Sequence, residues 1–165
     1  MCIKRQGWIS HGFTTAAYLE DVSIPALHAG VDKAGRQAGD VEISLPAFVV
    51  TGETEEEMAA ASFATRKQIA FYGSTPAYKA VLDHHGWGDA QVELNRMSKQ
   101  GEWDAMADVI DQEMLETFAV VAEPNQVAAG LTNRFGGLVD RLSFYAPYAG
   151  NPELWGGVIA DIKAG

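Results

Sequence analysis

Five side chains have the chemistry and the position expected of a binding site: His11, Arg66, Tyr72, Tyr145 and Tyr148. His11 could donate a hydrogen bond to a bound cofactor or substrate, or act as an acid or base, because the ordinary pKa of histidine lies near neutrality. The alternative is a loop histidine bonded to the backbone. We expect these residues to line a site for a small molecule, and no residue is assigned a catalytic role.

The other four candidates each have a simpler interpretation. Tyr145 and Tyr148 flank Pro147 and suit the lining of a substrate pocket, but packing of an aromatic pair against neighbouring loops is favoured. Arg66, ahead of Tyr72 and Tyr78, suits pairing with an anionic cofactor tail or a substrate carboxylate. A solvated helix face is the favoured interpretation of Arg66.

A metal site is not expected from Asp83, His84 and His85, although these residue types are metal ligands. Neighbouring positions on a helix point about 100° apart, so the two histidines cannot chelate one ion together. The single cysteine, Cys2, excludes a disulfide framework and a thiolate metal site within this sequence.

The elements that would position these side chains follow an α/β pattern. Apolar runs predict buried strands at 7–11, 41–50 and 138–145, with a short strand at 118–121. Helices are predicted from Thr14 or Thr15 to about 34, from Thr54 to 72, at 124–135 and from Asn151 onward, with several short helices between 75 and 121. Strands that alternate with helices in this order indicate a parallel sheet with crossover helices.

Local signals make four of these predictions more specific. Pro25 should break or kink the first helix, and Pro46 should cause a bulge or an interruption in the second strand, because proline has no backbone N–H. Thr54 and Glu57 form a capping box at a helix start. The last helix should bury the apolar side chains Leu154, Trp155, Val158, Ile159 and Ile162.

The composition limits the classes of partner. The 165 residues are 47% hydrophobic and 21% charged, which is ordinary for one globular domain. A net charge of -10 would repel nucleic acid and anionic membranes, so neither partner is expected. The sequence has no apolar run of about 18 residues and no secretory leader, and a reducing cytoplasm fits it.

Several blocks, in order, resemble the luciferase-like family of flavin- or deazaflavin-dependent oxidoreductases, and its deazaflavin-dependent actinobacterial branch in particular. They are GWISHGFTT at 7–15, LPAFVVTG at 45–52, IAFYGSTPAY at 69–78, HGWG at 85–88 and GLVDRLSFYAPY at 137–148. The resemblance extends over nearly all of 7–165. It implies a TIM (β/α)8 barrel, in which this chain would supply the C-terminal part, about strands six to eight, as one partial domain over 1–165 with a helical insertion at 75–115.

The same resemblance implies an oxidoreductase or monooxygenase that acts on a small organic substrate with coenzyme F420, or alternatively FMN, at the barrel mouth. The early strands and the phosphate loop of the family have no counterpart in this sequence. A closed barrel needs about 250 residues, so this sequence is too short to form one. A truncated gene, an alternative start and a split protein are all consistent with this. We therefore expect a homo-oligomer or a separate N-terminal half as the partner, and the alternative function is a non-catalytic half-barrel that self-associates or completes a partner.

Overall fold

The computed structural model describes residues 6–164, which form a four-stranded parallel sheet with helices on one face and across one end. The strands are β1 (Gln6–Ile9), β2 (Val41–Val50), β3 (Ala119–Val121) and β4 (Arg141–Tyr145). The long strand β2 is central: β1 and β3 pair with one of its edges and β4 pairs with the other. The α/β class predicted from the sequence is confirmed.

The helix that crosses from β1 to β2 begins where the sequence indicates. Thr15 caps α1 (Ala16–Tyr18) by accepting a hydrogen bond from the Tyr18 N–H. A π-helical turn, η1 (Leu19–Ser23), then leads into α2 (Ile24–Lys33), in whose first turn Pro25 lies. The predicted break at Pro25 therefore takes the form of a π-turn directly before the proline. A short 3₁₀ turn, η2 (Ala38–Asp40), connects α2 to β2.

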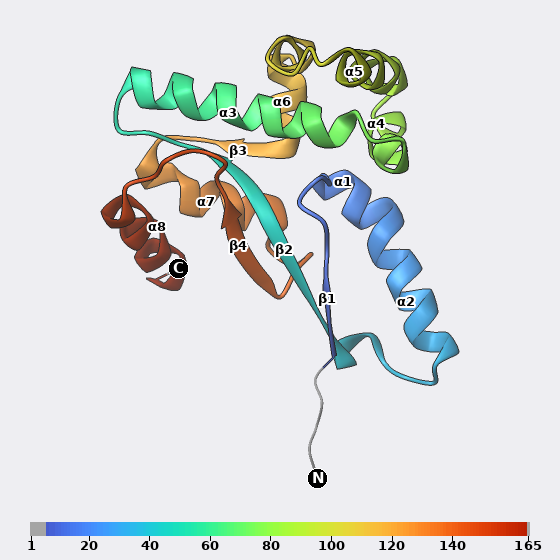
Figure 1. The fold of residues 1–165 in the computed structure, drawn as a ribbon. Coiled ribbons are helices and arrows are strands. Elements are labelled where there is room, and N and C mark those ends of the chain that lie inside the picture. The colour runs from blue at the N-terminus through green and yellow to red at the C-terminus, as the bar shows by residue number, and fades with distance from the viewer. Residues whose placement is uncertain (1–5, 165) are drawn as a thin grey trace.

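The remaining helices form two groups. The first group follows β2 and lies across the C-terminal ends of the strands (Figure 1). It comprises α3 (Glu55–Gly73), η3 (Pro76–Tyr78), α4 (Lys79–His84), α5 (Gly88–Gln100), η4 (Ala105–Val109) and α6 (Gln112–Phe118). The second group, α7 (Pro124–Phe135) and α8 (Pro152–Ala164), packs beside the sheet.

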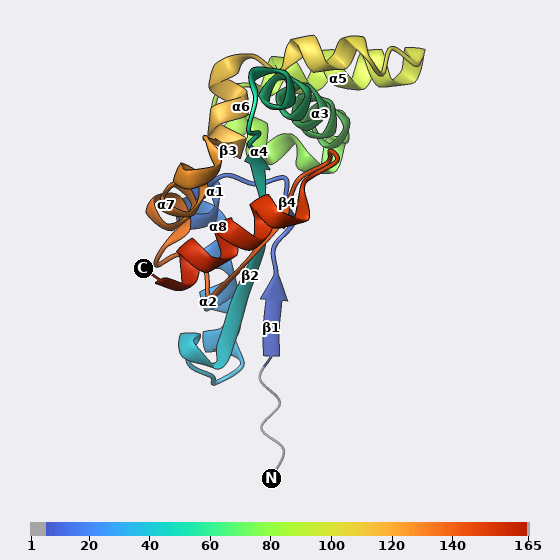
Figure 2. The same ribbon diagram turned by 90° about the vertical axis from the view of Figure 1, so that its left-hand side faces the viewer.

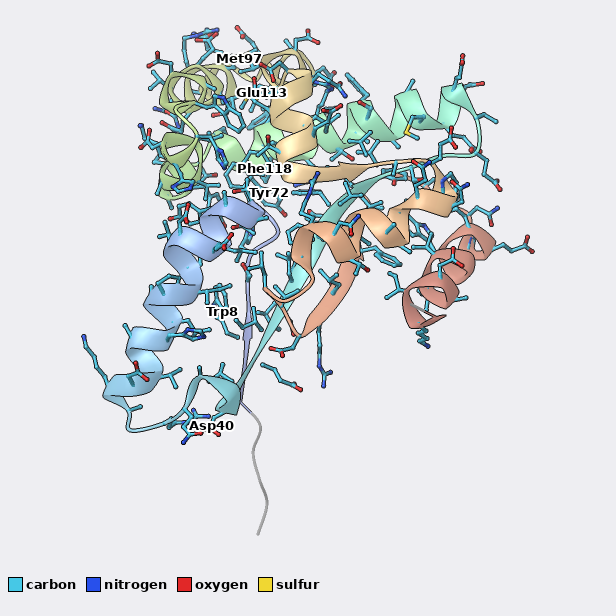
Figure 3. All side chains as sticks on the ribbon, turned by 180° about the vertical axis from the view of Figure 1, so that it is seen from behind. Trp8, Asp40, Tyr72, Met97, Glu113 and Phe118 are labelled. Carbon is cyan, nitrogen blue, oxygen red and sulfur yellow. The ribbon has the colours of Figure 1, made fainter. Side chains whose placement is uncertain are left out.

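The two faces of the sheet differ in what covers them. On one face, Leu45, Ala47 and Val49 of β2 pack in a buried cluster with residues of η1, α7 and α8. Trp8 points to this side, toward α2 (Figure 3). On the other face, Phe48 and Val50 pack under the first group of helices, in a second cluster that contains Phe13, Ile69 and Phe118.

The second face is covered only near the C-terminal end of β2. Further back along the strands, Ile9 is 76% exposed, Ser143 is exposed, and Ser44 and Pro46 are half-buried. Figure 2 shows the sheet from its side, with helices to the left of β1 and β2 and open space to the right. We call this region the open face, and define it by Ile9, Ser44, Pro46 and Ser143.

Two predictions about the strands are wrong, for reasons that lie in the neighbouring chain segments. β2 runs without interruption through Pro46, which stands in register with Ser143 of β4. On β2, the Ser44 carbonyl accepts from the Ser10 N–H and the Val50 carbonyl accepts from the Ala122 N–H. Alternate residues of a strand bond to the same edge, so the backbone of Pro46 faces this edge too. Its missing N–H would point into the gap between the end of β1 and the start of β3. No ladder bond is lost. β4, predicted as buried, is half exposed because only one of its edges is paired among residues 6–164.

The ends of α3 and α8 differ from prediction in detail. Thr54 caps α3 as predicted, but the Glu57 carboxylate accepts from the Glu53 N–H and not from the Thr54 N–H of a standard capping box. On α8, Val158 is buried and Leu154, Trp155 and Ile162 are partly buried, whereas Ile159 is 42% exposed. Within residues 6–164, no helix has both the length and the apolarity needed to cross a membrane.

Candidate active site

The candidate site lies where β1, β2 and β4 end. Because parallel strands run in the same direction, their C-terminal ends meet at one end of the sheet. His11 follows β1, Tyr145 ends β4, and Tyr72 reaches this end from the last turn of α3. Tyr72 is labelled in Figure 3.

The His11 ring is fixed in one orientation by its own loop. Its Nδ1 accepts a hydrogen bond from the Phe13 N–H at 3.0 Å. A backbone N–H can only donate, so Nδ1 carries no proton and the neutral ring must carry it on Nε2. Burial lowers the pKa of His11, and the bond from Phe13 acts in the same direction. His11 therefore presents a neutral imidazole with an Nε2–H donor.

Two aromatic rings contact His11, although the residue as a whole is exposed. It stacks on Tyr78 with 4.7 Å between ring centroids and meets the edge of Tyr72 at the same centroid distance. Gly12, next to it, has no room for a side chain, because a Cβ there would lie 3.0 Å from both the Pro46 carbonyl oxygen and Cδ1 of Tyr145. The glycine thus lets the His11 loop lie directly against β2 and β4.

Tyr72 and Tyr145 share a hydrogen bond of 2.8 Å between their hydroxyl oxygens. The Tyr145 ring stacks on Phe48 at 4.5 Å, which fixes its position above β2. Burial raises the pKa of Tyr145 well above its ordinary value, and the bond to Tyr72 adds to this effect. We call His11, Tyr72, Tyr78 and Tyr145 the aromatic cluster.

Tyr148 and Arg66 are bound to the protein itself. The Tyr148 hydroxyl donates to the Val49 carbonyl at 2.9 Å and accepts from the Thr51 N–H at 3.2 Å, and burial raises its pKa to about 12. The packing role that the sequence favours for Tyr148 thus fits its position. The Arg66 guanidinium donates to the Ile110 carbonyl and to Oε1 of Gln112, so the prediction of a solvated helix face is wrong. A role for Arg66 in binding an anion stays a prediction.

Sequence reasoning missed the residues that support the cluster from below. Phe13 stacks on Phe118 at 4.7 Å, and both belong to the core under the cluster. An apolar residue directly after His11-Gly12 was the available signal for Phe13.

The two neighbouring histidines bind different partners: His85 Nε2 lies 2.8 Å from the Thr15 hydroxyl, and His84 Nε2 lies 3.2 Å from the Asp21 carboxylate.

A groove beside the cluster is wide enough for a small molecule. Its volume is about 560 Å³, and its lining includes Phe63, Lys67, Phe71, Trp103 and Pro147. Phe71 and Trp103 are about half exposed, and the Phe71 ring contacts Tyr72 at 5.6 Å between centroids. The groove therefore adjoins the aromatic cluster at Tyr72.

The family follows from comparison with known proteins. The family model described as luciferase-like monooxygenase matches residues 4–141. This chain belongs to the luciferase-like monooxygenase family. The resemblance inferred from the sequence blocks is thereby confirmed.

The luciferase-like relatives are longer than this chain. It is 52% identical over 136 residues to the uncharacterized proteins Rv1360 of Mycobacterium tuberculosis (strain ATCC 25618 / H37Rv) and Mb1395 of Mycobacterium bovis (strain ATCC BAA-935 / AF2122/97). The match covers 82% of this chain and 40% of each relative. The chain thus spans well under half the length of these relatives.

A solved structure shares the fold. The coenzyme F420-dependent tetrahydromethanopterin reductase from Methanopyrus kandleri superposes with a TM-score of 0.69 at 16% sequence identity. The superposition covers 94% of this chain and 43% of the reductase. At this identity the likeness is one of fold.

Proposed function

We propose that this luciferase-like chain supplies one side of the active site of a coenzyme F420-dependent oxidoreductase that acts on a small organic substrate. In this proposal it forms about strands six to eight of a (β/α)8 barrel, with 75–115 as a helical insertion. One observation carries the proposal: a cluster of aromatic rings with neutral hydrogen-bond donors lies at the C-terminal end of parallel strands, next to an open face. Active sites of such barrels lie at this end.

The described residues fit the ring of a deazaflavin or flavin better than its anionic tail. Ile9 and Pro46 offer apolar surface on the open face, and His11 offers a donor at its edge. The two cations of α3 at this end are already engaged, since Arg66 is bonded to Ile110 and Gln112 and Lys67 pairs with Asp104. Donors for a phosphate group would therefore come from strands outside this chain. FMN is the alternative cofactor.

The bound cofactor would supply hydride transfer or oxygen activation, and the protein would supply orientation and shielding from water. The aromatic cluster would exclude water on one side of the reacting atoms. His11 Nε2–H and the tyrosine hydroxyls would orient polar atoms there. The groove next to Tyr72 has a volume within the range of about 300–1,000 Å³ found for ligand pockets, which supports a small organic substrate.

Completion of the barrel requires further strands. The open face and the 40% coverage of the relatives support a partner in the form of a separate N-terminal half or a second copy of this chain. The same open face supports the second candidate function, a non-catalytic half-barrel that self-associates or completes a partner. A reducing cytoplasm is the proposed location, in keeping with a single cysteine.

Titration with coenzyme F420, followed by its fluorescence, tests the proposal and separates the two candidates. The 165-residue chain alone should bind weakly, because loss of several contacts of about 1.5–3 kcal/mol each weakens binding by powers of ten. Addition of the N-terminal part of a relative such as Rv1360 should restore binding of coenzyme F420. FMN, the alternative cofactor, is titrated in the same way for comparison. Micromolar binding by the chain alone would contradict the incomplete site. No binding of either cofactor with the added half would favour the non-catalytic candidate.

A further inference from the structure

The aromatic cluster has more donors than its internal bonds use. Two hydroxyl groups that bond to each other place one hydrogen between their oxygens, and the second hydrogen remains available. In the Tyr72–Tyr145 pair this second O–H has no partner among residues 6–164. His11 Nε2–H is likewise available, because the only bond that the ring makes within the described residues uses Nδ1.

No anionic side chain competes for these donors. Within the described range of the chain, none of His11, Tyr72 and Tyr145 bonds to an Asp or Glu. Because burial raises the pKa of Tyr145 and lowers that of His11, both stay uncharged at neutral pH. Hydrogen-bond acceptors on a ligand would suit these donors best, because no carboxylate among residues 6–164 accepts from them.

The surroundings of the donors define the rest of the ligand. Tyr78 lies parallel to the His11 ring, Tyr72 meets it edge-on, and Phe71 extends the aromatic surface into the groove toward Trp103. Such walls favour a flat, apolar body. The polar atom of the ligand would then lie at one end, against His11 and the tyrosine pair.

We infer that the substrate is a planar apolar molecule with a carbonyl or carboxylate oxygen, held by the free hydroxyl hydrogen of the Tyr72–Tyr145 pair and by His11 Nε2–H. This inference rests on the proposed function for the statement that the ligand is the substrate. The site itself can be tested without the cofactor.

Four variants separate this role from a structural one. Tyr72→Phe and Tyr145→Phe each leave the other hydroxyl free to donate, so each should weaken ligand binding less than about threefold. The double variant Y72F/Y145F removes every hydroxyl hydrogen of the pair but keeps the rings, and should weaken binding at least about tenfold. His11→Asn keeps an oxygen that can accept from the Phe13 N–H, as in an Asx turn, and removes the Nε2–H donor together with the ring that stacks on Tyr78. It should also weaken binding about tenfold.

Calorimetric titration of the 165-residue chain with sodium benzoate at pH 7 tests the inference, with benzylamine, which has the same ring and a cationic donor group, as the matched control. Benzoate should bind with a dissociation constant in roughly the millimolar range, as expected for so small a ligand. The affinity for benzoate should fall about tenfold or more in Y72F/Y145F and about tenfold in H11N, and benzylamine should not bind. The melting temperature of each variant shows whether it is folded.

Equal benzoate affinity in the wild type and the double variant would overturn the inference, as would equal binding of benzylamine, or no binding of benzoate. Coenzyme F420 titration, with the N-terminal half added, is a separate measurement. If the double variant loses F420 binding and retains benzoate binding, the donors serve the cofactor and the inference fails while the proposed function stands. If benzoate binds as expected and F420 does not, the proposed function fails alone.

Discussion

At the scale of single residues, the tyrosine hydroxyl groups at the C-terminal end of the strands have two different roles. The hydroxyl of Tyr148 bonds to the backbone, whereas the Tyr72–Tyr145 pair has one hydrogen left to donate to a ligand. Tyr148 bonds to the Val49 carbonyl of β2 and to the N–H of Thr51, just after this strand, so Tyr148→Phe removes the partner of both backbone groups. We expect it to lower the free energy of unfolding by about 1–3 kcal/mol. Tyr145→Phe is the matched control and should lower it by less than about 1 kcal/mol, because the Tyr72 hydroxyl can bond to water. Urea denaturation of both variants measures the difference, and equal losses would contradict the division.

Alkaline pH should destabilise the chain through the same tyrosines. Burial raises the pKa of Tyr148 to about 12, whereas an unfolded tyrosine ionises near pH 10. The folded state therefore holds this proton more tightly, and the free energy of unfolding should fall as the pH rises from about 10 to about 12. Tyr145, whose pKa burial also raises, acts in the same direction. The double variant Y145F/Y148F should flatten this slope, and an unchanged slope would show that other groups cause it.

Residue positions that depend on local signals could be predicted, and those that depend on distant partners could not. Thr15, Thr54 and Pro124 mark helix starts because a cap or a proline acts on its own turn. The bond between Tyr72 and Tyr145 joins residues 73 positions apart, and nothing in either sequence block indicates it. The candidate site was thus predicted as a set of residues, without the contacts that distinguish Tyr145 from Tyr148.

At the scale of elements, helix α3 carries both a cap and a link to the next helices. Thr54 accepts from the Glu57 N–H, so Thr54→Ala should lower the free energy of unfolding by about 1 kcal/mol. Thr117→Ala, at a half-buried position of α6 where the hydroxyl bonds to the Glu113 carbonyl, is the control and should change it by less than about 0.5 kcal/mol. Thermal or urea melting that shows no loss for Thr54→Ala would contradict the cap.

The link between α3 and the segment before α6 should matter more than the neighbouring surface ion pair. Arg66→Met removes the bond to the carbonyl of buried Ile110 and should cost about 1.5–3 kcal/mol. Lys67→Met, one position along, breaks an exposed pair with Asp104 and should cost less than about 1 kcal/mol. Hydrogen exchange should show faster opening of η4 and α6 in the Arg66 variant only. Equal effects of the two variants would argue against this link.

The element predictions that failed concern the surroundings of a strand. Pro46 was expected to interrupt β2, but its missing N–H points into the gap between β1 and β3, a feature of sheet order that residues 41–50 do not encode. Leu138 to Tyr145 has the apolar pattern of a buried strand, yet β4 is half exposed because its second edge is unpaired in the described chain. Ile159 was assigned to the buried face of α8 and is exposed.

At the scale of the whole molecule, the decisive feature is the open face of the sheet. Helices cover the opposite face, and the first group of helices covers only the C-terminal end of β2. An apolar side chain as exposed as Ile9, beside unpaired strand edges, is a surface on which other strands or a second copy would pack. Family membership and the share of the relatives that the chain spans agree with this interpretation.

The mass of the chain in solution tests this central claim most directly. Size-exclusion chromatography with light scattering, on the purified 165-residue chain, should give a mass well above 17.7 kDa, because the open face and the free edges would associate. Ile9→Lys, which places a charge on the open face, should shift the population toward the monomer. A monodisperse monomer near 17.7 kDa that melts cooperatively would contradict the claim that this sheet is part of a larger barrel.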